Sequence, residues 1–280
     1  MTRILVTGAT GMLGQQVVKT LINDSSITVR CMRHHAPTTS FSQVAGQKIL
    51  ASLRHTYRAH NPTYSFSTTQ WVQADLVSGE GLNDAVRDID VIVHCTDSTN
   101  RLLEAACAAK VSHMVAISIV GCDRIPLSLY RQKVAGEEAI RTSGLGFSIL
   151  RATQFHPLID LVLRLSSRFP WIMPLLADWH FQSIDESEVG RRLAELALES
   201  PTETVQEIGG PQVLSLGEMA STWMALRQMR RTVLPLPLPG KVAAGYRRGD
   251  NTCGTEGVHG EITWAQWVQR MYQREKDCEI

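Results

Sequence analysis

Tyr130 and Lys133 stand three residues apart in a segment with helical periodicity, residues 129–142. Side chains at this spacing lie on nearly the same face of a helix, so the phenol and the ammonium group are expected to be neighbours. A phenol can give or take a proton at a carbonyl or alcohol oxygen if a nearby ammonium group lowers its pKa. The alternative is a helix with an exposed lysine and a half-buried tyrosine that takes part in no reaction.

Ser118 joins these two residues as a third candidate. It ends an apolar segment, residues 113–118, that predicts a strand. In parallel sheets ligands bind beyond the carboxyl ends of the strands, and a serine there could polarise a substrate oxygen. Lys133 could hydrogen-bond a nicotinamide ribose. Such a set suits hydride chemistry, because a nicotinamide cofactor supplies only the hydride and the proton must come from elsewhere.

A second candidate site is the glycine series Gly8, Gly11 and Gly14, which follows an apolar run and precedes an amphipathic helical pattern. A strand, a glycine turn and a helix N-terminus in this order bind phosphate, because open N–H groups and the helix dipole face the anion. Gly8 would take the tight turn, Gly11 would leave room for a pyrophosphate, and Gly14 would let the helix pack closely. The alternative is a plain strand-to-helix turn.

Arg33 stands at the end of the second predicted strand, where a dinucleotide-binding fold meets the adenosine ribose. An acidic residue there would bind the ribose 2′-hydroxyl. An arginine can instead pair with a 2′-phosphate through charge-assisted hydrogen bonds, with Arg30 as a second candidate. The sequence therefore favours NADP(H) over NAD(H). The alternative is that Arg33 is a solvated surface charge.

The elements that would position these residues alternate between strand and helix patterns along the first half of the chain. This alternation predicts an α/β fold: a Rossmann-type, doubly wound parallel sheet with right-handed connections and helices on both faces. The predicted strands are residues 4–7, 27–32, 71–74, 91–95, 113–118 and 147–150, and the predicted helices include 80–87, 99–109 and 129–142.

The rest of the chain departs from this alternation. Residues 36–69 form an apparent insertion, rich in Ser, Thr, His and Gln. We expect residues 1–153 to form an NAD(P)-binding Rossmann domain. Residues 154–280 would form a smaller C-terminal α/β portion that packs on it and builds the substrate pocket. In this portion residues 170–176 are predicted to be a loop and residues 235–239 a rigid extended segment.

Three tryptophans of this C-terminal portion allow two interpretations. Trp171, Trp264 and Trp267 could contact a protein partner or lie in the core, and the core is the favoured interpretation.

The composition excludes several classes of protein. The chain has 280 residues, 44% of them hydrophobic, and a formal net charge of +1, so neither nucleic acid nor a membrane is an expected partner. A predicted strand begins within four residues of the N-terminus, so no signal peptide is expected. The six cysteines have no C-x-x-C spacing and are expected to be buried thiols, without a metal site. A cytoplasmic location follows from these features.

Five motifs carry a resemblance when they are taken together. They are residues 7–14 (TGATGMLG), 74–76 (ADL), 117–121 (ISIVG), 130–133 (YRQK) and 150–155 (LRATQF). With this set the chain resembles the atypical short-chain dehydrogenase/reductases, and within them the NmrA-like, NAD(P)-binding branch. The likeness runs from residue 1 to about residue 275, with residues 36–69 as an apparent insertion.

The resemblance implies a dinucleotide site. Arg33 would meet the 2′-phosphate, Asp75 and Leu76 would border the adenine, and Cys95 and Thr96 would line the side of the adenine ribose. The residues that would hold the pyrophosphate are Gly8, Thr10, Gly11, Met12, Leu13 and Gly14.

The resemblance also implies catalytic positions. Ser118, Tyr130 and Lys133 fall where conventional members place their catalytic serine, tyrosine and lysine, and Lys133 would also contact the cofactor. The residues that would flank the nicotinamide and the substrate are Thr153, Gln154 and Phe155. Conventional members place the tyrosine and lysine four residues apart. The spacing of three in this chain turns Lys133 by about a quarter turn around the helix.

Two functions remain open at this stage. The first is an NADP(H)-dependent oxidoreductase that acts on a small carbonyl, quinone-like or unsaturated substrate. The second, also implied by the NmrA-like resemblance, is a non-catalytic NADP(H)-binding redox sensor that regulates a protein partner. A sugar-nucleotide epimerase or dehydratase on the same scaffold is a third, more distant interpretation. A monomer and a homodimer are both compatible with the sequence.

Overall fold

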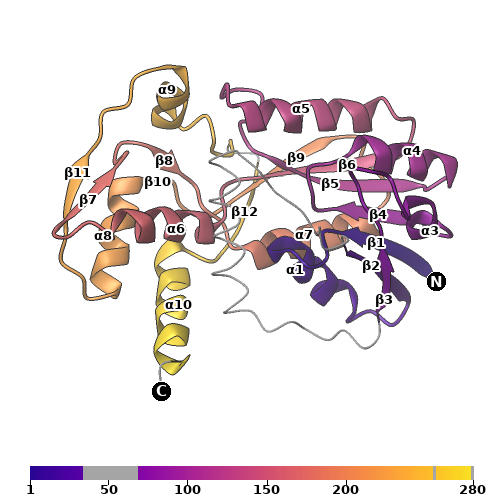
Figure 1. The fold of residues 1–280 in the computed structure, drawn as a ribbon, viewed down its shortest axis with the longest axis horizontal. Coiled ribbons are helices and arrows are strands. Elements are labelled where there is room, and N and C mark those ends of the chain that lie inside the picture. The colour runs from indigo at the N-terminus through magenta and orange to yellow at the C-terminus, as the bar shows by residue number, and fades with distance from the viewer. Residues whose placement is uncertain (34–68, 255–256, 279–280) are drawn as a thin grey trace. The chain divides into compact units, whose positions relative to one another are not determined.

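The structure is a computed structural model that describes residues 1–33, 69–254 and 257–278 (Figure 1). Apart from Thr69, the predicted insertion at residues 36–69 lies outside the described residues. The chain forms two compact units, each assembled from separate stretches of sequence. Unit 1 comprises residues 1–117, 135–150 and 189–205, and unit 2 comprises residues 118–134, 151–188 and 206–280. The domain boundary expected at residues 153 and 154 remains a prediction.

An eight-stranded sheet runs in the order β12-β9-β6-β5-β4-β1-β2-β3. Strand β1 pairs in parallel with both β2 and β4, and β4 pairs in parallel with β5. The order 3-2-1-4-5-6 is that of the doubly wound dinucleotide-binding fold, so the predicted fold class is confirmed. The strands are β1 (Thr2–Thr7), β2 (Ile27–Arg33), β3 (Gln70–Gln73), β4 (Val91–His94), β5 (His113–Ile119), β6 (Gly146–Ala152), β9 (Val205–Gly209) and β12 (Val258–His259).

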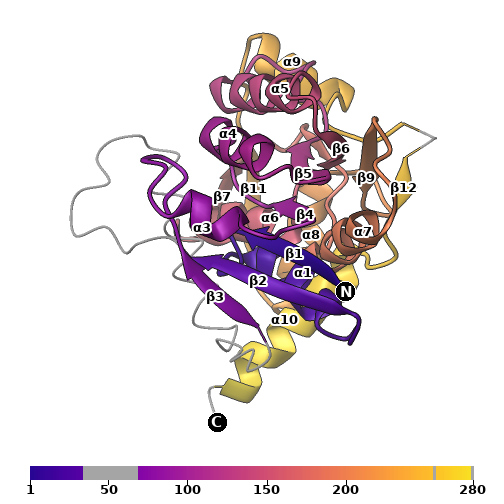
Figure 2. The ribbon, with the colours of Figure 1, turned by 90° about the vertical axis from the view of Figure 1, so that its right-hand side faces the viewer.

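In unit 1, helices cover both faces of the sheet (Figure 2). Helix α1 (Met12–Leu21) lies against β1 and β2 on one face, and α7 (Glu186–Leu198) approaches α1 where Gly190 meets Gln16. Helices α3 (Leu82–Val86) and α4 (Asn100–Ala108) lie together on the opposite face. Helix α5 (Ser128–Arg141) begins in unit 2 and ends in unit 1.

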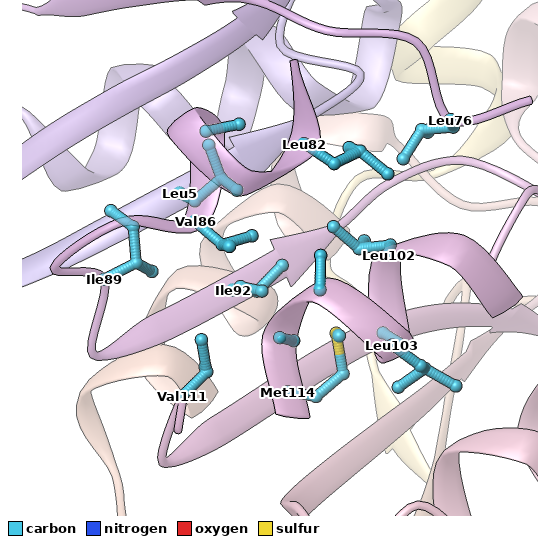
Figure 3. Packing of buried hydrophobic residues seen from close by; sticks show 14 of the residues in the cluster. Leu5, Leu76, Leu82, Val86, Ile89, Ile92, Leu102, Leu103, Val111 and Met114 are labelled. Atoms are coloured by element: carbon cyan, nitrogen blue, oxygen red, sulfur yellow. The ribbon is translucent and has the colours of Figure 1, made fainter. Parts of the chain in front are cut away.

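The core of unit 1 follows from the alternation of side chains across each strand. Leu5, Ile92 and Met114, from three adjacent strands, point to the face covered by α3 and α4 (Figure 3). There they join Leu82 and Leu102, and all five side chains are buried. Truncating one of these side chains to alanine removes about 2–5 kcal/mol of stability, since a cavity remains. This core holds the carboxyl ends of β1 and β4 in place.

Unit 2 is built on three helices that contact one another: α6 (His156–Ser166), α8 (Leu216–Leu226) and α10 (Trp264–Cys278). A partly buried charge network ties them together. Asp160 accepts hydrogen bonds from Trp223 Nε1 at 2.7 Å and from Arg164, and Glu275 binds both Arg164 and Arg227. Two arginines and two carboxylates balance in charge, as buried ionic groups require.

Two small sheets complete unit 2. Strands β7 (Ile172–Leu175) and β11 (Thr232–Pro235) pair in parallel, and β8 (His180–Phe181) pairs antiparallel with β10 (Leu214–Ser215). The prediction of a loop at residues 170–176 was therefore wrong. Pro174 suggested a loop, but a two-stranded ribbon has open edges where a proline needs no hydrogen-bond partner.

The short helix α9 (Lys241–Arg248) was not predicted. Glycines at positions 240, 245 and 249 flank or interrupt it, and glycine lowers helix propensity. Among the described residues, no helix has both the length and the apolar character needed to cross a bilayer.

Candidate functional site

The glycine turn between β1 and α1 requires glycine at two positions for different reasons. Gly8 has a left-handed backbone, φ +68°, and a Cβ there would lie 2.7 Å from Thr96 Cγ2. A Cβ on Gly14 would lie 2.2 Å from the carbonyl oxygen of Gly8, so α1 could not approach the turn. These contacts hold the turn and the first turn of α1 together within unit 1.

Gly11 differs, because it stands at the exposed N-cap position of α1. Its N–H donates to Gly8 O at 2.8 Å, and as a glycine it offers no side-chain cap to the N–H groups that follow. Thr10 is exposed, Met12 is half-buried, and Leu13 is buried beneath the turn. The first turn of α1 therefore presents N–H donors that its own N-cap residue leaves open, which suits a pyrophosphate.

The carboxyl ends of β1 and β4 are fixed by a buried histidine that the sequence did not single out. His94 Nδ1 lies 2.8 Å from Thr7 Oγ1, and His94 Nε2 lies 3.3 Å from Thr99 Oγ1. Cys95 and Thr96 follow, both half-buried. Thr96 Oγ1 is buried and has no hydrogen-bond partner among the described residues. A buried hydroxyl of this kind next to Gly8 fits a bound ligand better than an empty turn.

Arg33 ends β2 and is exposed. Arg30, the second candidate for the 2′-phosphate, has another role: its guanidinium donates to the carbonyl oxygens of Ala85 and Arg87 at 3.0 and 2.7 Å. It thus satisfies the C-terminal carbonyls of α3, as cations at helix ends do. These hydrogen bonds give Arg30 a structural role, and the pairing of either arginine with a 2′-phosphate stays a prediction.

Asp75 and Leu76 follow β3, close to the predicted adenine position. Asp75 Oδ1 accepts from the N–H of Val77 at 2.6 Å, an Asx turn that shapes residues 75–79. Leu76 is buried in the core of unit 1 and points toward Leu82 (Figure 3). These contacts account for the backbone conformation around Asp75 and Leu76. A contact of either residue with the adenine stays a proposal.

In unit 2, Tyr130 is paired with a second tyrosine. The phenolic oxygens of Tyr130 and Tyr246 lie 3.0 Å apart, and both side chains are buried. Helix α9 carries Tyr246, whose ring stacks on Trp179 with centroids 4.3 Å apart and also contacts Phe181. These aromatic contacts fix the position of the Tyr246 hydroxyl.

Burial raises the pKa of Tyr130, and this effect exceeds the opposing effect of the neighbouring Tyr246 hydroxyl and Gln154 amide. Burial also raises the pKa of Tyr246. The sequence had suggested that Lys133 lowers the pKa of Tyr130, and the direction was wrong. Burial, which the spacing of two residues does not reveal, is the largest influence on the pKa of Tyr130, and Lys133 is not among the described groups that shift it. Both phenols are therefore protonated at neutral pH.

Gln154 and Asn251 extend this group of polar side chains. Asn251 Nδ2 donates to Gln154 Oε1 at 3.0 Å and to the carbonyl oxygen of His180 at 2.9 Å. Gln154 Nε2 and Asn251 Oδ1 are buried, and among the described residues neither has a hydrogen-bond partner. The donor Gln154 Nε2 and the acceptor Asn251 Oδ1 can thus each form a further hydrogen bond beside the tyrosine pair. A polar ligand or an ordered water would bind there.

Ser118 belongs to the same neighbourhood. Its Oγ lies 3.9 Å from Cys122 Sγ, and Cys122 in turn acts electrostatically on Tyr130. Both residues are buried. Lys133 is half-buried one helical turn beyond Tyr130. Ser118 is thus a neighbour of Cys122, and its joint action with Tyr130 stays a prediction.

Thr153 and Phe155, the other predicted substrate residues, have clear structural roles. Thr153 Oγ1 donates to the carbonyl oxygen of Gln182 at 2.5 Å, and Phe155 caps α6 and bridges to Ile184. Their contact with a substrate stays a prediction.

Sequence reasoning missed Tyr246, Asn251 and Trp179, because each comes from a segment far along the chain without a recognisable motif. It also expected buried thiols throughout, whereas Cys107 is exposed. The predicted core position of Trp264 and Trp267 agrees with their burial, but Trp171 is 78% exposed.

The sheet order, the glycine turn and the open N-terminus of α1 define an NAD(P)-binding Rossmann-type fold. A profile of the NmrA-like family matches residues 1–235. The chain belongs to the NmrA-like family, and the resemblance stated from the sequence is confirmed.

Solved structures share the fold at low sequence identity. An NADPH-dependent quinone oxidoreductase from Escherichia coli is 18% identical with a TM-score of 0.75, covering 96% of this chain and 99% of that one. The triphenylmethane reductase of Citrobacter sp., solved with NADP(H), is 17% identical with a TM-score of 0.70, covering 97% and 100%. A nucleoside-diphosphate-sugar epimerase from Staphylococcus aureus is 14% identical with a TM-score of 0.70, covering 96% and 100%. Identities this low establish the fold alone.

A curated relative matches part of the chain. The photosystem II assembly factor Ycf39 of Cyanophora paradoxa is 27% identical over an alignment of 168 residues, and the match covers 54% of this chain and 45% of that protein. The chain therefore corresponds to less than half the length of that relative.

Proposed function

We propose that this protein is an NADP(H)-dependent oxidoreductase that reduces a small carbonyl, quinone-like or unsaturated substrate. The observation that carries this proposal is the buried pair of protonated phenols, Tyr130 and Tyr246, 3.0 Å apart. A buried phenol kept neutral at physiological pH is a proton donor, and reduction of a carbonyl or quinone requires a proton at oxygen.

The cofactor would be held in unit 1 by the glycine turn. Gly8, Gly11 and the N–H groups at the start of α1 would bind the pyrophosphate, and the Thr96 hydroxyl would donate to or accept from the bound nucleotide. Arg33 would pair with the 2′-phosphate, which underlies the proposed preference for NADP(H) over NAD(H). When bound, the nicotinamide supplies the hydride.

The proton would come from Tyr130. The Tyr130 hydroxyl would donate its proton to the substrate oxygen as the neighbouring carbon accepts the hydride, so the carbonyl becomes an alcohol. The Tyr246 hydroxyl would then hydrogen-bond the phenolate left on Tyr130. Gln154 Nε2, a buried donor with an open valence, would orient the substrate oxygen. Ser118 and Lys133 are proposed to polarise the substrate and to bind the nicotinamide ribose.

The names of two structural neighbours support a reductase and the substrate class: one is an NADPH-dependent quinone oxidoreductase and the other a triphenylmethane reductase solved with NADP(H). The competing function is an NADP(H)-binding sensor that regulates a protein partner without turnover. The cytoplasmic location and the choice between monomer and homodimer stay predictions.

Replacing Tyr130 with phenylalanine tests the proposal. Tyr130→Phe should reduce NADPH-dependent turnover of quinones or carbonyls by about 100-fold or more, since general-acid catalysis supplies about 10²–10⁴-fold. NADPH affinity, measured by calorimetry, should stay within about twofold of wild type, because the cofactor residues are untouched. Unchanged turnover would remove Tyr130 from the chemistry. NADPH binding by wild type without any oxidation, over a broad panel of acceptors, would favour the sensor.

A further inference from the structure

Unit 2 carries an exposed apolar surface on the outer face of the β7–β11 ribbon and the segment after it. In the register of this ribbon Ile172 pairs with Thr232 and Pro174 with Leu234, while Met173 and Val233 form the next pair. Met173 and Leu175 are buried on the inner face. Side chains alternate across each strand, so Ile172 and Leu234 point outward. The apolar patch comprises Phe169, Trp171, Ile172, Leu234, Leu236 and Leu238.

Trp171 is the most exposed member of the apolar patch, at 78%, and its backbone is left-handed with φ +61°. A bulky residue in this conformation is strained by about 1–2 kcal/mol. An extended conformation would follow the strand alternation and turn the ring to the inner face, beside Met173. The observed conformation holds the Trp171 ring in solvent. The carbonyl oxygen of Trp171 accepts a hydrogen bond from the N–H of Thr232 at 2.8 Å. Exposure of the Trp171 side chain is thus accompanied by a strained backbone, which lowers the stability of the fold.

Most charged residues around the apolar patch are basic, and one acidic residue there, Asp178, is paired with Arg247, which donates to the carbonyl oxygen of Leu238 in the patch. No acidic residue occurs between Asp160 and Asp178 or between Glu218 and Asp250, the two stretches that contain the patch. Arg168 precedes Phe169, and Arg230 and Arg231 precede β11. Arg168, Arg230 and Lys241 are exposed. The net charge of +1 over the whole chain conceals this local excess of positive charge.

We propose that the apolar patch with its basic border binds the surface of an anionic lipid bilayer. Tryptophan and leucine side chains that stand out from a surface enter the interfacial layer of a membrane, while arginine and lysine beside them bind anionic headgroups. The protein would lie on the membrane without spanning it. This revises the expectation of no membrane partner, which rested on the overall charge.

The same charges disfavour a second copy of the chain as the occupant. A two-fold dimer through this patch would bring the basic border of one copy, Arg168, Arg230 and Arg231, close to the basic border of the other. Like charges at an interface repel. An anionic surface instead attracts the basic side chains of the border.

Flotation of the full chain with lipid vesicles tests the proposal. We expect binding to vesicles of phosphatidylglycerol mixed with phosphatidylcholine, loss of binding at high salt, and little binding to phosphatidylcholine alone. Trp171→Asn removes the ring and suits a left-handed backbone, so it should fold and bind at least several-fold more weakly. Removing charge in the double variant Arg230→Gln/Arg231→Gln should weaken binding by about fivefold per arginine.

Trp71→Ser is the matched control, since Trp71 is a partly exposed tryptophan on β3 in unit 1. This variant should bind vesicles as wild type does. Thermal unfolding checks that each variant is folded, and the readout needs neither cofactor nor turnover. Equal binding to neutral and anionic vesicles, no vesicle binding, or unchanged binding of Trp171→Asn would overturn the proposal. So would a wild-type dimer that Trp171→Asn converts to a monomer, because self-association would then account for the patch.

Discussion

The phenolic oxygens of Tyr130 and Tyr246 lie 3.0 Å apart, although 116 residues separate them along the chain. The hydrogen bond from Tyr246 lowers the pKa of Tyr130, while burial raises it by more. Tyr246 therefore acts on the proton of Tyr130 without being required to touch the substrate. In the proposed reaction Tyr130 is the catalytic residue and Tyr246 is a positioning residue.

The variant Tyr246→Phe tests this relation. Loss of one hydrogen bond to the developing phenolate should lower kcat by about tenfold and leave KM nearly unchanged. Because the hydrogen bond lowers the pKa of Tyr130, its removal should raise that pKa further. The alkaline limb of the pH–rate profile should then move to higher pH than in wild type. Tyr272→Phe, on α10, should have no such effect, and a limb that moves to lower pH would refute the role of Tyr246.

Gly11→Ala tests the glycine turn. A Cβ on Gly11 meets only Gly8 O, at 3.1 Å, so the variant should fold, yet its methyl group would occupy the approach of a pyrophosphate. NADPH affinity should fall by about tenfold or more, with the melting temperature within a few degrees of wild type. Gly254→Ala is the control, because nothing lies within 4 Å of a Cβ there. Equal NADPH affinities for Gly11→Ala and Gly254→Ala would place the cofactor elsewhere.

Arg33→Ala tests the cofactor preference. Loss of a charge-assisted pair with the 2′-phosphate should weaken NADPH binding by about tenfold and leave NADH binding unchanged in calorimetric titrations. Arg3→Ala, an exposed arginine at the opposite end of the sheet, should change neither affinity. No preference of the wild type for NADPH, or a preference that survives Arg33→Ala, would contradict the assignment.

His156 predicts a pH dependence of stability. It is buried against the rings of Trp264 and Trp267, its Nδ1 lies 2.8 Å from Ser183 Oγ, and burial lowers its pKa to about 4. The unfolded chain binds this proton near pH 6.5 and the folded chain only near pH 4. Stability from the neutral histidine is therefore fully present above about pH 6.5 and declines as the pH falls toward 4.

The decline should approach about 1.4 kcal/mol per pH unit within this window, measured by denaturant unfolding at several pH values. His156→Gln should flatten the profile, whereas His259→Gln, at an exposed position, should leave it unchanged. A steep decline that persists in His156→Gln would show that other groups cause it.

The parts of the fold that the sequence predicted are those encoded locally. The apolar run before Gly8, the helical pattern after Gly14 and the buried strand at residues 91–94 each lie within a dozen residues, and the structure has all of them. Strand β7 depends instead on pairing with β11, about 60 residues away, and no local pattern announces that partner.

The same reasoning applies to the candidate site. Tyr130, Ser118 and Gln154 occupy motifs that can be read from the sequence, whereas Tyr246 and Asn251 come from segments without a motif. The direction of the pKa shift of Tyr130 depends on burial by α9 and its surroundings, which spacing alone does not reveal. The sequence named Arg33 first and Arg30 second, but it could not reveal that Arg30 donates to the carbonyls of Ala85 and Arg87.

The most direct test of the central claim is the transfer of deuterium from nicotinamide-labelled NADPH to a quinone or carbonyl acceptor, followed by mass spectrometry of the product. If the protein is an NADP(H)-dependent oxidoreductase, the carbonyl product carries one deuterium, or the quinone is reduced with stoichiometric loss of the label from NADPH. Tyr130→Phe should slow this transfer by about 100-fold or more. Tight NADPH binding with full retention of the label, across the whole panel of acceptors, would contradict the claim.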